Sequence, residues 1–139
     1  TKSILAGNKI SVFNYGKHRR DFTFIDDIVK GIILVLDQPA KPNQSWNSAN
    51  PDPGSSSAPW RIYNIGNNSP VKLLDYIQAI ESSLEIKANK DLMPLQPGDV
   101  IDTYADVNEL VENFNYKPST SINEGVSKFV DWYKEYYKS

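Results

Sequence analysis

The chain has 139 residues, of which 40% are hydrophobic, and this supplies enough apolar material for one ordinary globular core or for part of one. A formal net charge of -2 argues against a general attraction to nucleic acid or to an anionic membrane, because both depend on a surplus of basic residues. Cysteine is absent, which excludes disulfides and thiol chemistry, and we expect a cytoplasmic protein with no membrane segment.

The N-terminal residues predict the end of a helix and two short strands. The helix end covers residues 1–6 and is stopped by a glycine. Alternating residues predict a strand over 10–13, and a turn follows at 14–17. An aromatic and β-branched run predicts the second strand over residues 22–25.

A helix predicted over residues 28–36 is apolar nearly all round, so we expect neighbouring structure to cover it on more than one side. Asp26 or Asp27 is expected to cap its N-terminus, because a carboxylate there accepts free backbone N–H groups and faces the positive end of the helix dipole. Gly31 indicates a close contact of this helix with a neighbour.

Residues 39–59 contain five of the nine prolines and a run of three serines, so a long loop without regular structure is predicted. Trp46 and Trp60 lie near its ends and favour a loop that is held in place over a disordered linker. A tolerated insertion without function is the alternative.

The second half of the chain predicts a strand over residues 60–66, and then a helix from Pro70 to Leu84 that Ser69 caps. Another strand is expected to start in residues 86–90. Two further helices are predicted from capping-box spacing, in which a Ser or Asp stands three residues before a Glu. These helices open at Asp106 and Ser121.

Several kinds of site have no candidate residues in this sequence. The seven glycines are too far apart for a dinucleotide-binding fingerprint. No tyrosine has a lysine four residues on, the nearest case being Tyr15 with Arg19. His18 is the only histidine, and no orienting carboxylate or nucleophile is indicated for it. Asp26 and Asp27 are predicted as a cap and not as metal ligands, so we assign no catalytic, cofactor-binding or metal-binding residue.

Arg20 follows a basic stretch, residues 17–19, and its guanidinium group can grip two phosphate oxygens with a planar fork. The alternatives are a solvated basic turn and an ion pair with Asp21. RNA binding is disfavoured, because the chain is acidic overall and no RNA-binding motif accompanies this stretch.

The turn Gln96-Pro97-Gly98-Asp99 can present an amide and a carboxylate to one ligand, and the carboxylate of Asp99 suits sugar or ribose hydroxyl groups. An ordinary turn without a ligand is the alternative, since these residue types commonly build turns.

Taken together, these motifs resemble extended short-chain dehydrogenase/reductases that act on nucleotide sugars, and most closely the bacterial UDP-glucuronate 4-epimerases. The similarity extends over essentially all of residues 1–139. The segments that carry it are, in order, Val12-Phe13, Arg20 to Val29, Tyr63 to Asn67, Gln96 to Asp99 and Tyr104 to Asp106.

The resemblance implies an α/β fold of short strands and helices: the C-terminal, substrate-binding part of such an enzyme without its N-terminal Rossmann core. Residues 1–139 then form one nucleotide-sugar-binding region, and the segments around 22–37 and 61–68 are expected to pack on the absent Rossmann domain. The chain begins at Thr1 without a methionine and lacks a phosphate-binding glycine loop, so we expect a fragment that is inactive alone.

The resemblance also implies roles for individual residues. Phe13 contacts the uracil, Arg20 the diphosphate, and Asp99 the ribose hydroxyls. Gln96 stands where many relatives have an arginine, so its phosphate contact is expected to be weaker. Thr103 replaces a tyrosine that is common in galactose-type epimerases, which argues against that subfamily.

For the parent protein, the resemblance implies an NAD-dependent isomerase that converts UDP-glucuronate to UDP-galacturonate through a 4-keto intermediate. NAD and the catalytic tyrosine belong to the absent N-terminal part, and the parent is expected to be a homodimer. The alternatives are a fragment of a UDP-glucuronate decarboxylase or of a sugar-nucleotide dehydratase, and a stand-alone nucleotide-sugar-binding module.

Overall fold

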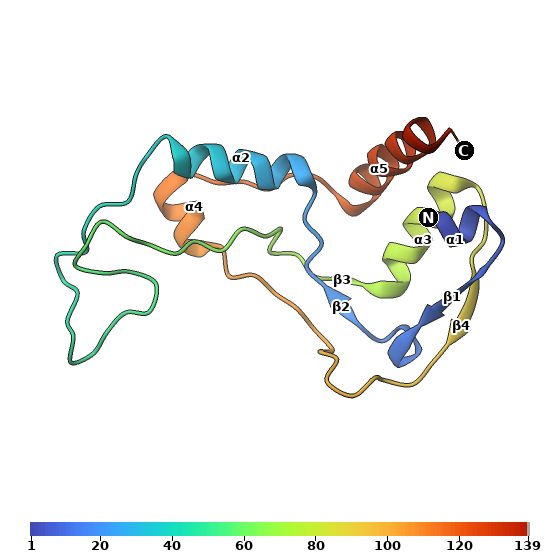
Figure 1. The fold of residues 1–139 in the computed structure, drawn as a ribbon, viewed down its shortest axis with the longest axis horizontal. Coiled ribbons are helices and arrows are strands. Elements are labelled where there is room, and N and C mark those ends of the chain that lie inside the picture. Colours follow the sequence, from blue (N-terminus) through green and yellow to red (C-terminus); the bar gives the residue numbers. More distant parts are fainter. Residues whose placement is uncertain (139) are drawn as a thin grey trace.

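A computed structural model describes residues 1–138 and shows a mixture of helices and short strands, as the sequence predicts (Figure 1). In chain order the elements are α1 (Lys2–Leu5), β1 (Lys9–Val12), the 3-10 turn η1 (Phe13–Gly16), β2 (Arg19–Arg20), α2 (Ile25–Leu36), β3 (Val71–Lys72), α3 (Leu73–Leu84), β4 (Asn89–Leu92), α4 (Asn108–Phe114) and α5 (Ile122–Tyr137). Along the longest axis of the molecule, α1, α3, α5, β1 and β4 lie at one end, the loop at residues 39–59 forms the other end, and α2 and α4 lie between them (Figure 1). Irregular segments connect them.

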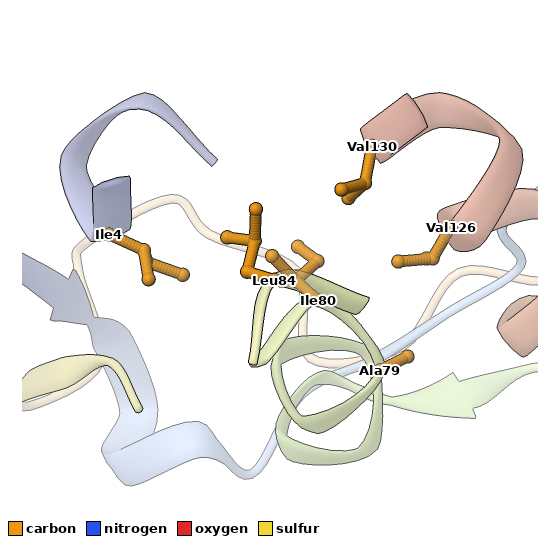
Figure 2. Close-up of a cluster of buried hydrophobic side chains, with 6 residues drawn as sticks. All are labelled: Ile4, Ala79, Ile80, Leu84, Val126 and Val130. Carbon is orange, nitrogen blue, oxygen red and sulfur yellow. The ribbon is translucent and has the colours of Figure 1, made fainter. Parts of the chain in front are cut away.

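The main hydrophobic core lies between α1, α3 and α5. Figure 2 shows side chains of α5 and α1 pointing toward the apolar side of α3. The buried members are Ile4, Ala79, Ile80, Leu84, Val126 and Val130. Since each fully buried Val, Leu or Ile contributes about 1.5–3 kcal/mol, this cluster holds the three helices together, and Ile10 of β1 packs against it.

The strands form two small sheets. β1 pairs with β4 in parallel, with Lys9 opposite Asn89 and Val12 opposite Leu92. β2 pairs with β3 in an antiparallel arrangement. β4 begins at Asn89, inside the range of residues 86–90 in which a strand was predicted to start, whereas the predicted helix at 70–84 begins three residues late because residues 71–72 pair with β2.

Two predicted strands are absent from the described residues. Residues 22–24 have no regular structure, and residue 25 already begins α2. Residues 60–66 carry only an isolated bridge between Arg61 and Ser55. A strand is stable only when a neighbour completes its hydrogen-bond ladder, and these apolar segments have none within residues 1–138.

The apolar helix α2 is largely uncovered, contrary to the expectation that it is buried on several sides. Ile32 is 52% exposed and Leu36 is 74% exposed. The predicted close contact at Gly31 is present: a Cβ there would lie 3.2 Å from the ring of Tyr116 and 3.3 Å from Ile65. One narrow side of α2 therefore packs inside this chain, and the rest faces outward.

The capping predictions had mixed outcomes. Phe24 is the N-cap of α2, and neither Asp26 nor Asp27 caps it, so that prediction was wrong. Ser121 does cap α5, accepting a hydrogen bond from the Glu124 amide at 3.2 Å. The predicted cap of α3 by Ser69 is also wrong, because the helix starts later with Lys72 as its N-cap.

The loop at residues 39–59 contains no helix or extended strand, as predicted. It is held by side chains: Asn43 donates from Nδ2 to Ser55 Oγ at 2.8 Å, and the Ser55 hydroxyl donates to Asp52. Hydrogen bonds from Ser55 and from the Gly54 amide lower the pKa of Asp52 below its ordinary value. The loop thus has a defined path on one side of the molecule (Figure 1).

Candidate functional site

The predicted site residues follow the carboxyl ends of the parallel strands β1 and β4: Phe13 and Arg20 come after β1, and the Gln96–Asp99 turn comes after β4. Phe13 comes directly after β1 and is half-buried. The Met93 amide donates to the Val12 carbonyl at 3.0 Å, and the Tyr15 amide donates to the Met93 carbonyl at 2.9 Å. These bonds hold the two chain segments together beyond the strands, at the kind of edge where α/β proteins bind ligands.

A second seam joins residues 18–20 to residues 99–103. The Arg19 amide donates to the Ile101 carbonyl at 3.0 Å, and the Thr103 amide donates back to the Arg19 carbonyl at 3.2 Å. The Thr103 hydroxyl also accepts from the Asp21 amide at 3.2 Å. Thr103 therefore has a structural contact in this chain.

Arg20 lies on the Gln96–Asp99 turn, so two of the predicted site residues are brought together. Its Nη2 is 3.4 Å from Asp99 Oδ1 and donates to the Val100 carbonyl at 2.7 Å. Its Nη1 donates to the carbonyl groups of Ile101 at 2.8 Å and Arg19 at 3.0 Å. The side chain is 26% exposed, so the guanidinium group is fixed in place and still accessible from solvent.

Asp21 has a different role from the ion pair that the sequence left open. Its Oδ2 accepts from the Asn68 amide at 3.1 Å and from the Ala105 amide at 3.2 Å, and its Oδ1 accepts from the Ser69 amide at 3.3 Å. One carboxylate thus joins three segments that are distant in sequence. Sequence reasoning missed this, because the partners are backbone groups that carry no residue signal.

The Gln96–Asp99 segment is a tight turn, as predicted. The Asp99 amide donates to the Gln96 carbonyl at 3.2 Å. Gly98 has φ of +82°, and with Pro97 before it this matches a type II turn, which needs a positive φ at its third position. The Gln96 side chain is exposed, whereas Asp99 is 32% exposed and turned toward Arg20.

His18 is the functional candidate that sequence reasoning missed. It is 3% exposed, and its Nδ1 lies 3.1 Å from the Val100 carbonyl and 3.3 Å from the Ile101 carbonyl. Its Nε2 lies 3.4 Å from Asp99 Oδ2 but forms no regular hydrogen bond there. The sequence does not indicate a carboxylate near His18, and the fold brings Asp99 close to it.

An apolar pocket lies away from this cluster. It has a volume of about 260 Å³ and lies between the start of α2, α3 and α5. Its walls include Phe22, Tyr76 and Phe129, and Phe22 and Tyr76 stack with ring centroids 4.1 Å apart. None of the four predicted site residues lines it.

Known proteins resemble this chain in both sequence and structure. Residues 1–66 match the family described as NAD dependent epimerase/dehydratase. Along nearly its whole length the chain is homologous to UDP-glucuronate 4-epimerases, which confirms the resemblance and the α/β fold class stated from the sequence.

Three relatives illustrate the epimerase-family similarity. Protein CapI of Staphylococcus aureus is 54% identical over 138 residues, which is 99% of this chain and 41% of that protein. UDP-glucuronate 4-epimerase 2 of Arabidopsis thaliana is 42% identical over 142 residues, 99% of this chain and 32% of that protein. The structure of UDP-glucuronic acid 4-epimerase from Bacillus cereus, with UDP-glucuronic acid and NAD, matches with a TM-score of 0.76 and 25% identity over 98% of this chain and 38% of that one.

The chain therefore spans only part of the proteins that it matches: 41%, 32% and 38% of the length of these three. Within residues 1–138, no helix is long and apolar enough to cross a membrane.

NAD is named for the family and is present in that solved structure. A pyrophosphate cradle needs glycines that leave open space for the cofactor. Here a Cβ on Gly66 would lie 2.4 Å from Ala105 Cβ, and one on Gly16 would lie 2.6 Å from a Leu74 methyl group. Space at these glycines is filled by the chain itself. Gly16 and Gly66 therefore cannot form such a cradle.

Proposed function

We propose that this chain is the C-terminal, substrate-binding part of an NAD-dependent UDP-glucuronate 4-epimerase. Such an enzyme interconverts UDP-glucuronate and UDP-galacturonate through a 4-keto intermediate. In this proposal NAD and the catalytic groups belong to other residues of the complete gene product, and residues 1–139 alone are inactive. The parent protein is proposed to be a cytoplasmic homodimer.

The observation that carries this proposal is the contact between Arg20 and Asp99. It places a guanidinium group that can bind phosphate 3.4 Å from a carboxylate that can bind hydroxyl groups. Both residues follow the paired strands β1 and β4 in the chain. A nucleoside diphosphate needs both kinds of group at neighbouring positions, because its ribose and its phosphates are adjacent. Homology to UDP-glucuronate 4-epimerases supports the choice of UDP.

Arg20 is proposed to bind the diphosphate, Asp99 the ribose hydroxyls, Phe13 the uracil, and Gln96 a phosphate oxygen without charge. The terminal nitrogens of Arg20 now donate to backbone carbonyls of residues 19, 100 and 101. A diphosphate would replace some of these acceptors, because charge-assisted bonds to phosphate are stronger than bonds to neutral carbonyls. Half-buried Phe13 supplies an aromatic face that can contact a base.

The uncovered apolar surface supports the place of this chain in a larger protein. Ile25 and Leu36 on α2 are 61% and 74% exposed, and Ile62 in the unpaired segment is 52% exposed. Monomeric proteins rarely leave apolar side chains exposed together over a large area. We propose that the segments around 22–37 and 61–68 pack on a Rossmann domain, where residues 61–66 would gain a strand partner.

The decisive experiment assays the complete gene product with UDP-glucuronate and follows the sugar protons by NMR. UDP-galacturonate is the expected product. A pentose product would identify a decarboxylase, and a deoxy sugar from another nucleotide sugar would identify a dehydratase. If the complete gene product binds a UDP-sugar but converts none, the stand-alone binding module is the correct function.

A further inference from the structure

His18 is buried below the pair that the proposed function uses. Its ring is 3% exposed, whereas Arg20 and Asp99 are 26% and 32% exposed above it. Its Nε2 lies 3.4 Å from Asp99 Oδ2, and Arg20 Nη2 lies 3.4 Å from Asp99 Oδ1. The two carboxylate oxygens of Asp99 thus face nitrogens of two different side chains: Arg20 donates a hydrogen bond to Oδ1, and His18 Nε2 lies close to Oδ2 without a regular hydrogen bond.

The second nitrogen of His18 fixes the orientation of the ring. Nδ1 faces the carbonyl oxygens of Val100 and Ile101 at 3.1 and 3.3 Å. Carbonyl oxygens only accept hydrogen bonds, so Nδ1 must be the donor. The ring plane is therefore set by the backbone that directly follows Asp99, and this places Nε2 on the Asp99 side of the ring, 3.4 Å from Oδ2.

Both ring nitrogens of His18 face oxygen atoms that accept hydrogen bonds. Each of its polar neighbours accepts hydrogen bonds: the carbonyls of Val100 and Ile101 and the carboxylate of Asp99. Nε2 therefore faces a carboxylate oxygen, toward which a ring nitrogen can act only as a donor. Arg20, in β2, is the cation that pairs with the other oxygen of this carboxylate.

Resting on the proposed function, we infer that His18 is a positioning residue for ribose recognition. It orients the Asp99 carboxylate through Nε2, so that an oxygen of Asp99 is fixed toward the hydroxyls of a uridine nucleotide. His18 does not touch the nucleotide. It acts through Asp99, and the geometry restricts its effect to the ribose hydroxyls.

Two substitutions separate the two sides of the ring. In His18→Gln the amide nitrogen occupies a place close to Nε2 and can still donate to Asp99. In His18→Asn the amide nitrogen occupies a place close to Nδ1, so that it serves the carbonyls of residues 100 and 101 and leaves Asp99 without its partner. Both variants are uncharged and polar, which makes each a control for the other.

The test compares binding of UDP with that of 2′,3′-dideoxy-UDP to the complete gene product by calorimetry. Since a hydrogen bond to a charged group is worth more than a neutral one, wild type should prefer UDP about tenfold or more. His18→Gln should keep most of this preference. His18→Asn should bind the two nucleotides within about twofold of each other, because it lacks the oriented acceptor. A role for His18 in folding alone would weaken both nucleotides equally.

A double-substitution cycle keeps the test decisive if His18→Gln folds poorly. Asp99→Asn should lose the preference for UDP, and adding His18→Asn should lower it no further. If folded His18→Asn retains the full preference, the inference is overturned and the proposed function stands. If wild type shows no preference for the ribose hydroxyls, the assignment of Asp99 and this inference fall together. If wild type does not bind UDP at all, the proposed function itself is wrong.

Discussion

Asp27, in the first turn of α2, accepts a hydrogen bond from the backbone amide of Thr120 at 3.0 Å. The Asp27 carboxylate is 1% exposed and also lies 3.7 Å from the Lys30 ammonium group. It therefore ties the outward-facing helix α2 to the segment that leads into α5. Burial by itself raises the pKa of Asp27, but hydrogen bonds from Thr120 and Ser119 and the charge of Lys30 outweigh it and leave the pKa lowered.

The first prediction concerns the charge of Asp27. A lowered pKa in the folded state means that ionised Asp27 stabilises the fold above the ordinary carboxyl pKa, and that this contribution disappears as the pH falls through the lower, folded value. Asp27→Asn should lower the free energy of unfolding by about 1–3 kcal/mol at neutral pH. In urea titrations of the complete gene product, the two proteins should converge in stability as the pH falls below the ordinary carboxyl pKa and through the lowered pKa of folded Asp27.

Asp26 supplies the matched control for that experiment, since it is the neighbouring carboxylate and is exposed. Asp26→Asn should change the stability by no more than about 0.5 kcal/mol. Equal effects of the two substitutions at neutral pH would show that general helix-dipole electrostatics matter and that the contact with Thr120 does not.

The second prediction concerns the buried carboxylate of Glu81, which joins α3 to the chain before β4. Glu81 accepts from the Ala88 amide at 2.9 Å and pairs with Lys90 and Lys87. The hydrogen bond from Lys90 is the largest influence on its pKa, which is lowered despite the opposing effect of burial. The carboxylate is therefore charged inside the protein and depends on its partners.

Lys90 and Lys87 form a matched pair for this test, because they are 30% and 83% exposed. Lys90→Met should destabilise the protein by about 1–3 kcal/mol, since it removes the closest partner of a buried charge. Lys87→Met should have little effect on the thermal midpoint, because water screens exposed pairs. The reverse order of the two variants would contradict this account of Glu81.

The third prediction concerns Gly66, where three segments of the site meet. A Cβ at this position would lie 2.4 Å from Ala105 Cβ and 2.9 Å from Asp21 Oδ2. Gly66→Ala should therefore push the Ala105 segment off Asp21 and cost about 1–3 kcal/mol of stability. Gly54→Ala is the control, because the nearest atom there, Asp52 Oδ1, would be at an ordinary 3.5 Å. Thermal unfolding that shifts equally for both variants would show that lost glycine flexibility matters more than crowding.

The fourth prediction concerns Arg20 in the proposed catalytic cycle. Arg20→Ala should lower kcat/KM for UDP-glucuronate, because a charged phosphate partner is lost. The decrease should correspond to a loss of roughly 2–4 kcal/mol of transition-state stabilisation. Arg19→Ala is the control: its side chain is exposed and reaches only the Pro70 carbonyl, at 3.4 Å. An unchanged specificity constant in the Arg20 variant would remove Arg20 from the substrate site.

Local signals were predictable from the sequence, and contacts between distant segments were not. The N-cap at Ser121 and the end of α3 at Leu84 depend on neighbouring residues, and both were predicted correctly. The strand predicted at residues 60–66 failed, because its ladder requires a partner that residues 1–138 do not supply. His18 and Asp99 lie far apart in the sequence, and the backbone hydrogen bonds of Arg19 with residues 101 and 103 bring their segments together.

The last prediction concerns the uncovered face of α2 in the isolated chain. Ile32 and Ile33 are 52% and 51% exposed on this helix, and an exposed apolar face of this kind favours association. The chain of residues 1–139 alone should self-associate at micromolar concentration in light scattering. Ile32→Lys with Ile33→Glu should shift it toward monomer, because charged side chains resist burial. Val100→Lys, at a residue that is 59% exposed away from α2, should leave the association unchanged. A monodisperse monomer with a high melting temperature would show that α2 needs no further cover.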